Sequence, residues 1–106
     1  MKNLKEMIDI FPIKIGQLLE KRLVNEHIYE IRIKAESPIL VYSKYGENII
    51  KYYPTKEELK NMMQKISNYS LYAYEEDIRC LLYTFDAAEE DVYRVLCSHR
   101  SHVVYN

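Results

Sequence analysis

Ile28-Tyr29-Glu30-Ile31-Arg32-Ile33-Lys34 is the segment with the clearest structural period in this chain. Apolar side chains alternate here with the charged side chains of Glu30, Arg32 and Lys34. A period of two is typical of a β-strand with one buried face, because successive side chains point to opposite faces. We therefore predict a strand over residues 28–34 that packs one face on a core.

Two short helices are predicted upstream of this strand. The first should end before Pro12, which cannot continue a helix. The second leaves charged side chains for the solvent opposite its apolar stripe. The stripe residues are Leu4, Met7, Ile8 and Phe11 in the first helix, and Ile15, Leu18, Leu19 and Leu23 in the second.

Downstream of the strand the pattern is typical of a β-hairpin. Residues 39–42 and 49–53 are rich in β-branched and aromatic side chains, and Gly46 between them can adopt a positive φ. Thr55 and Glu58 then have the spacing of a capping box at a helix start. Leu71, Tyr74 and Ile78 continue at helical spacing, which predicts a second short helix ending near Arg79.

The predicted fold class is therefore α+β. It has two N-terminal helices, a small antiparallel sheet of about three strands that includes the hairpin, and further helices packed on one face of the sheet.

Composition excludes several classes of function. The 15 basic and 16 acidic residues nearly cancel, which disfavours binding of nucleic acid through its phosphates. No apolar run reaches the roughly 18 residues that span a bilayer, so we expect no membrane insertion and a cytoplasmic location. The two cysteines are too few for a disulfide framework. Cys97, His99 and His102 lack a fourth ligand, so no metal site is predicted.

Three motifs point to a known family. Glu30-Ile31-Arg32-Ile33-Lys34, Ser37-Pro38-Ile39 and, most specifically, Asn68-Tyr69-Ser70-Leu71-Tyr72-Ala73-Tyr74-Glu75-Glu76-Asp77-Ile78-Arg79 resemble the amino-terminal region of the stage III sporulation protein AA family. The resemblance covers roughly residues 1–79. It implies an amino-terminal α+β domain of a mother-cell ATPase from endospore-forming bacteria, similar to the hexameric motors of secretion and pilus retraction.

The resemblance also implies partners and a location. In the family this domain packs against a RecA-like ATPase domain, and the assembly is thought to energise the channel between mother cell and forespore. The implied partners are therefore the ATPase domain, neighbouring protomers and membrane components of the channel. The implied location is the mother-cell cytoplasm, at the periphery of the forespore membrane.

Catalysis is not expected of this chain by itself. The phosphate-binding loop Gly-x-x-x-x-Gly-Lys-Ser/Thr needs glycines that the sequence does not supply, since its two glycines are Gly16 and Gly46. We therefore expect no catalytic or cofactor-binding residues here, and ATP and magnesium are implied only for the missing ATPase domain. The sequence is interpreted as a truncated contact and coupling module. The alternative is an independent small α+β protein-interaction domain without catalytic activity.

Residues after Arg79 depart from the family pattern, which continues with a glycine-containing strand and turn. Cys80-Leu81-Leu82-Tyr83-Thr84 and Asp86-Ala87-Ala88 instead resemble the translation of a transposon adaptor used in short-read sequencing. We therefore hypothesise that residues 80–106 are a non-native tail produced by read-through. The alternative is a divergent C-terminal helix, for which Asp86 and Glu89 have capping spacing and Val92, Val95 and Leu96 could pack.

Charged and aromatic side chains supply the candidates for protein contact. Glu30 and Arg32 can form an exposed cross-strand ion pair, although in the related motors an arginine such as Arg32 or Arg79 can reach a neighbour's nucleotide. A tyrosine platform for single-stranded nucleic acid is disfavoured against packing by the near-neutral charge. The interaction candidates are Glu30, Arg32, Tyr69, Tyr72, Glu75, Glu76 and Arg79.

Overall fold

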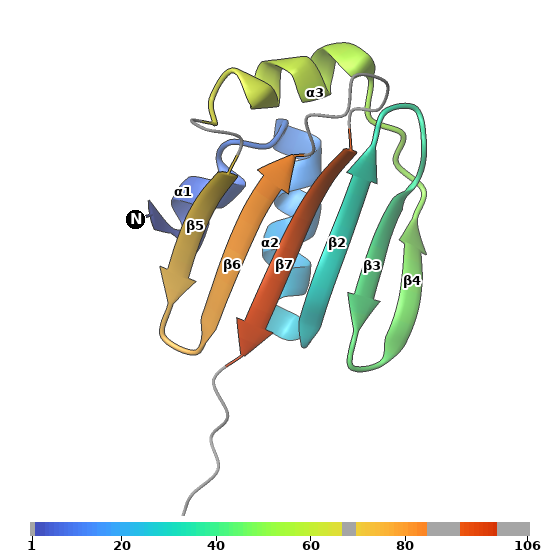
Figure 1. Cartoon of the computed structure of the whole chain (residues 1–106). Coiled ribbons are helices and arrows are strands. Elements are labelled where there is room, and N and C mark those ends of the chain that lie inside the picture. The colour runs from blue at the N-terminus through green and yellow to red at the C-terminus, as the bar shows by residue number, and fades with distance from the viewer. Residues whose placement is uncertain (1, 67–69, 85–91, 100–106) are drawn as a thin grey trace, which may run out of the picture.

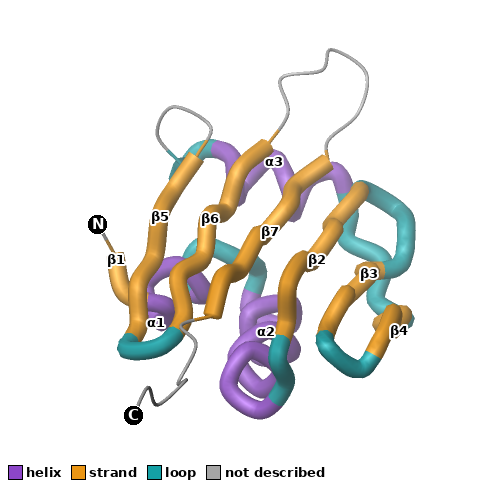
Figure 2. The backbone as a smooth tube through the Cα atoms, turned by 60° about the horizontal axis from the view of Figure 1, so that its bottom comes forward, coloured by secondary structure: helices purple, strands orange, loops and turns teal. Residues whose placement is uncertain are grey.

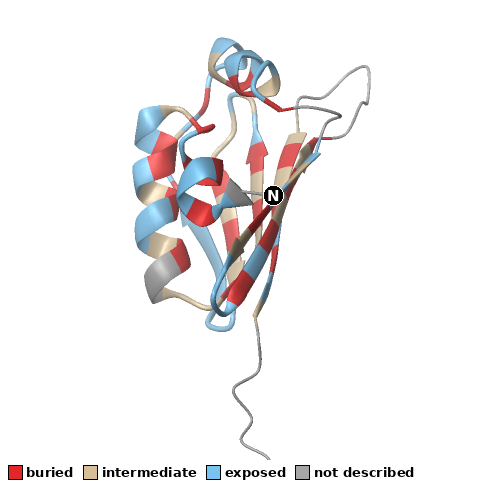
Figure 3. Ribbon diagram, turned by 90° about the vertical axis from the view of Figure 1, so that its left-hand side faces the viewer, coloured by how far each residue is buried: buried red, intermediate tan, exposed pale blue. Residues whose placement is uncertain are grey.

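The computed structural model of the protein describes residues 2–66, 70–84 and 92–99. In these residues a β-sheet is covered by helices on one face, and the ribbon of Figure 3 places no helix on the other face. The helices are α1 (Leu4–Ile8), α2 (Ile13–Asn25) and α3 (Lys56–Met63), and the strands are β1 (Lys2–Asn3), β2 (Ile28–Lys34), β3 (Ile39–Ser43), β4 (Gly46–Ile50), β5 (Ser70–Glu75), β6 (Ile78–Thr84) and β7 (Val92–His99).

The strands of the described residues form one sheet in the order β1-β5-β6-β7-β2-β3-β4 (Figures 1 and 2). The six strands from β5 to β4 are antiparallel to their neighbours, and β1 adds a short parallel pair at the β5 edge. Two local units can be recognised in this order. One is the β5–β6 hairpin, and the other is the β2–β3–β4 meander.

Strand β7 joins these two units. It pairs with β6 so that Leu82 lies opposite Val95, and with β2 so that Ile31 lies opposite the same Val95. Both pairings are antiparallel, and the pairing with β2 connects residues far apart in the chain. Without β7 the sheet would fall into two separate pieces.

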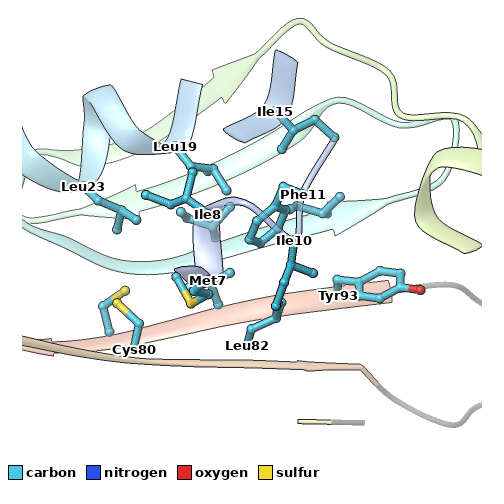
Figure 4. Packing of buried hydrophobic residues seen from close by; sticks show 14 of the residues in the cluster. Met7, Ile8, Ile10, Phe11, Ile15, Leu19, Leu23, Cys80, Leu82 and Tyr93 are labelled. Carbon is cyan, nitrogen blue, oxygen red and sulfur yellow. The ribbon is translucent and has the colours of Figure 1, made fainter. Parts of the chain in front are cut away.

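The core lies between the sheet and helices α1 and α2. Met7, Ile15 and Leu19 from the helices and Leu82 and Tyr93 from the strands are completely or almost completely buried (Figure 4). A side chain at Gly16 would place its Cβ 3.1 Å from the carbonyl oxygen of Ile8, so glycine allows the two helices to pack closely.

Helix α3 lies across one end of the sheet (Figure 1). It begins with the predicted capping box, which is confirmed: Thr55 Oγ1 accepts from the Glu58 amide, and Glu58 accepts from the Thr55 amide. The carboxylate of Glu58 also accepts a hydrogen bond from the Tyr52 hydroxyl at 2.8 Å. The buried hydroxyl of Tyr93 donates to the carbonyl oxygen of Leu59 at 2.7 Å, which ties α3 to β7.

The predicted fold class is wrong. The sheet has seven strands in the described residues instead of about three. The helices expected before residue 26 and after Thr55 are present, but the segment around Leu71 and residues 92–96 form strands instead of helices. The meander of residues 28–50 does include the predicted strand 28–34 and a turn in which Gly46 adopts a φ of +107°. It accounts for only one side of the sheet.

The segment around Leu71, predicted as a helix, forms β5, a turn and the start of β6. Leu71 and Ala73 face the core while Tyr72 and Tyr74 lie on the other face, so both faces of the strand carry apolar groups. Such a strand shows no clean alternation, and its apolar residues match a helical period by coincidence. Pairing with β6 makes this segment a strand instead of a helix.

The helix considered for residues 86–96 is also wrong where the structure describes it. Val92–His99 is a strand that buries Tyr93, Val95 and Cys97 on the core side, which is a period of two. Asp86 and Glu89, which suggested a helix start, lie outside the described residues. The pairing shows the conformation of residues 92–99 and leaves the read-through hypothesis about their origin untested.

The Tyr93 hydroxyl provides a test of the packing of α3 on the sheet. Tyr93→Phe keeps the ring but removes the donor to the buried carbonyl of Leu59, so the free energy of unfolding in urea should fall by about 1 kcal/mol. Tyr53→Phe changes an exposed ring in the segment between β4 and α3 and should stay within about 0.5 kcal/mol of the wild type. Equal unfolding curves for Tyr93→Phe and the wild type would contradict this arrangement.

Candidate functional site

Helices α1 and α2 cover one face of the sheet, and no described helix covers the opposite face (Figure 3). We call this opposite face the open face. The strand register and the alternating burial assign its residues. They are Glu30, Arg32, Lys34, Leu40, Tyr42, Glu47, Ile49, Ser70, Tyr72, Tyr74, Arg79, Leu81, Tyr83, Val92, Arg94, Leu96 and Ser98.

One cross-strand row of the open face joins two of the predicted candidates. Tyr72 lies opposite Leu81, Leu81 lies opposite Leu96, and Leu96 lies opposite Glu30. Three strand spacings separate Tyr72 from Glu30, which is roughly 14 Å. The two side chains therefore border the same surface, with leucines between them.

The apolar part of this row is hollowed. A depression of about 290 Å³ is lined by side chains and backbone of Tyr72, Tyr74, Arg79, Cys80, Leu81, Leu96, Cys97 and Ser98. Tyr72 is 54% exposed and Leu96 is 37% exposed, so both are available to a second molecule. Small ligands usually bind in enclosed pockets. A shallow hollow with an aromatic rim is more typical of a protein interface, in which a side chain of the partner inserts into the hollow.

Arg32 is held in place on the open face. Its Nε donates to a carboxylate oxygen of Glu30, and its guanidinium lies 5.0 Å from the centroid of the Tyr42 ring. The hydrogen bond to Glu30 and the charge of that carboxylate hold the pKa of Arg32 above its ordinary value. The predicted ion pair is therefore present, but it runs along one strand instead of between two.

A second group of candidates lies at the end of the sheet where β5 turns into β6. Glu75 and Glu76 line a cavity of about 430 Å³ with Arg79 and His99, and a neighbouring one of about 530 Å³ with His27. Glu75 and Glu76 are exposed. They therefore lie beside the open face, at its edge.

Two imidazole rings are stacked at this end. The centroids of His27 and His99 are 3.7 Å apart, and one ring nitrogen of His99 lies 2.6 Å from the carbonyl oxygen of Ile28. Burial, and then the charges of His99 and Lys44, lower the pKa of His27 below its ordinary value. The position of His27 beside the His99 ring and near Lys44 therefore disfavours a positive charge on His27.

The structure brings four of the seven predicted interaction residues onto one face. Glu30, Arg32, Tyr72 and Arg79 lie on the open face, Glu75 and Glu76 lie at its end, and Tyr69 lies outside the described residues. Leu81 and Leu96, which line the hollow, were not among the predicted interaction residues. Alternation in residues 92–97 was the available signal, but Val92, Val95 and Leu96 also fit a helix.

Two further findings concern metal binding and membrane-spanning helices. Among the described residues, no group of three or more His, Cys, Asp or Glu side chains is placed to hold a metal ion. None of the described helices combines the length and the apolar character that crossing a membrane requires.

The stacked histidines predict a pH dependence of stability. The pKa of His27 is lower in the folded protein than in the unfolded chain. As the pH falls, the unfolded chain therefore binds a proton at this histidine at a higher pH than the folded protein does, which favours unfolding. Stability should therefore be level above the ordinary histidine pKa of about 6.5 and fall as the pH drops below it. In His27→Gln the unfolding midpoint should fall less over the same pH range. An unchanged pH profile for this variant would contradict the packing of the two rings.

A family model described as sporulation stage III, protein AA matches residues 1–96. Neither the curated proteins nor the solved structures give a match. The matched range extends past Arg79 into β7. The hypothesis that residues 80–106 are adaptor read-through stays a prediction, which genomic reads across codons 79 and 80 would decide. Because the match spans well over half of the chain, the protein belongs to the stage III sporulation protein AA family.

Proposed function

We propose that this chain is a contact and coupling module of a secretion-type ATPase that acts in sporulation. The ATPase domain, neighbouring protomers and membrane components of the mother cell–forespore channel are its proposed partners. Its proposed place is the mother-cell cytoplasm, peripheral to the forespore membrane. The observation that carries this proposal is the open face, where one side of the sheet presents apolar and aromatic side chains that no helix of the described residues covers.

The composition of the open face favours contact with a protein. An antiparallel sheet that only meets water usually has a polar outer face. Here Tyr72, Leu81 and Leu96 form an apolar centre, with Arg79 at its edge. Tyrosine and arginine are the residue types that contribute most often to the energy of protein interfaces, and exposed apolar patches mark such interfaces.

The charges of the open face indicate what the partner surface should carry. Arg32, Arg79 and Arg94 outnumber Glu30 and Glu47, and Arg32 already binds Glu30. An acidic side chain of a partner would complement the exposed Arg79. A surface with an apolar centre and a carboxylate at its edge therefore fits this face best.

The proposed mechanism is mechanical. The open face belongs to one hydrogen-bonded sheet, so the contact residues move together with the helices packed behind them. A nucleotide-dependent movement of the ATPase domain against this face would displace the module as a body. ATP and magnesium would be held by the ATPase domain, and this chain would transmit the movement.

Tyr72 offers a direct test of the contact. Tyr72→Ala removes a 54% exposed ring from the rim of the hollow on the open face, whereas Tyr53→Ala removes a 58% exposed ring from the segment between β4 and α3. With a separately expressed RecA-like domain of a stage III sporulation protein AA as the probe, Tyr72→Ala should weaken binding at least about tenfold, because tyrosines are among the residues that contribute most to interface energy. Tyr53→Ala should bind like the wild type.

Thermal unfolding of both variants would verify that each remains folded. Equal calorimetric affinities for the two variants would place the contact away from the open face. Failure of the wild-type chain to bind the probe at all would contradict the coupling role itself.

The proposal also predicts that the purified chain does not hydrolyse ATP. The sequence contains no phosphate-binding loop, because Gly16 and Gly46 are far more widely spaced than the two glycines of that motif. With ATP and Mg²⁺, phosphate release should equal that of buffer, while an ATPase with a phosphate-binding loop serves as the positive control. Turnover that follows the folded chain through size-exclusion chromatography would contradict this expectation.

A further inference from the structure

The two cysteines of the chain face each other across the centre of the sheet. Cys80 in β6 is the direct register partner of Cys97 in β7. Both side chains lie on the core side, with exposures of 1% and 9%, and Figure 4 shows Cys80 beside Met7 among the buried core residues. The pair is separate from the contact residues of the open face, although it belongs to the same two strands.

The register places the two cysteines within reach of a covalent bond. Directly opposed residues of an antiparallel pair have Cα atoms about 4.5 or 5.5 Å apart, depending on the type of pair. Disulfides form over Cα separations of about 4.4–6.8 Å. The two side chains are direct register partners and are both buried on the core side of the sheet, so the thiols lie next to each other. Both Cα separations fall inside this range, so either type of pair brings the two cysteines to a distance at which a disulfide can form.

We propose that Cys80 and Cys97 are a redox-active pair that forms an intramolecular disulfide when a low-molecular-weight disulfide is the oxidant. The bond would staple β6 to β7 at the centre of the sheet. The proposal goes beyond the contact role and does not depend on it.

The reaction proceeds by two thiol–disulfide exchanges. The thiolate of one cysteine attacks a sulfur of the small disulfide, which forms a mixed disulfide and releases one small thiolate. The thiolate of the other cysteine then attacks the protein sulfur of the mixed disulfide, closes the Cys80–Cys97 bond and releases the second small thiolate. Two electrons pass from the cysteine pair to the small disulfide, and the two cysteine protons end on the two released thiols.

Burial makes this reaction slow in the folded protein. The hydrogen bond with Cys80 and the apolar surroundings raise the pKa of the Cys97 thiol above its ordinary value, so little thiolate is present. The small disulfide also has no direct path to either sulfur, because both are buried. Oxidation should therefore follow local opening of the β6–β7 pair, and the closed disulfide should be protected from reductants in the same way.

The test uses the full chain in its folded state, incubated with oxidised glutathione. Intact mass should show the loss of two hydrogens, and the oxidised protein should take up no alkylating reagent after denaturation. Because the bridge encloses residues 81–96, the unfolded chain loses conformational freedom, and Tm should rise by on the order of 10 °C. Dithiothreitol under denaturing conditions should reverse both changes.

Cys97→Ala and Cys80→Ala are matched controls, since each leaves one thiol and cannot close the bridge. In both variants oxidised glutathione should give no rise in Tm, and the product should be a mixed disulfide or no product. Two alkylatable cysteines in the wild type after prolonged oxidation, or only disulfide-linked dimers, would overturn the proposal. An intramolecular disulfide that lowers Tm would contradict the proposal that the bond links β6 and β7 in their folded register.

Discussion

Strand β7 is hydrogen-bonded to β6 on one side and to β2 on the other, and this double pairing holds the sheet together. The β5–β6 hairpin and the β2–β3–β4 meander are local units that could each form from neighbouring residues. A small hairpin or meander is marginal alone, because it buries too little apolar surface. When β7 inserts, Val95 and Tyr93 complete the floor on which α1 and α2 pack, and the Tyr93 hydroxyl fixes α3 at the end of the sheet.

The same strands supply two different surfaces. On the core side, alternate residues such as Leu82 and Val95 are buried by the helices, and the cysteine pair lies among them. On the open side, the residues between them, Leu81 and Leu96, face outward and form the centre of the proposed contact surface. A change in the pairing of β6 and β7 would alter both surfaces together. This coupling of core and contact face suits a module whose role is to transmit movement.

Local signals in the sequence were sufficient for some elements. The strand over residues 28–34, the glycine at position 46 and the Thr55–Glu58 box each reflect forces within a few residues, and each is present in the structure. The alternation of buried and outward side chains holds from Glu30 onward, because the register shifts between Ile28 and Glu30 and leaves Tyr29 exposed. The centre of the sheet could not be predicted this way, because β5 is apolar on both faces and β7 gains its conformation from distant partners. Glu30 and Tyr72 were identified as contact candidates, but only the register of four strands shows that they share a face.

Hydrogen exchange of the folded chain in D₂O tests the central role of β7 most directly. Amides in the described parts of β6 and β7 have strand partners and lie in the middle of the sheet, so opening them requires disruption of the whole domain. The account predicts that peptides covering residues 78–84 and 92–99 exchange more slowly than those of the β4 edge. Exchange of residues 92–99 at the rate of an unfolded chain, while residues 28–34 remain protected, would contradict it.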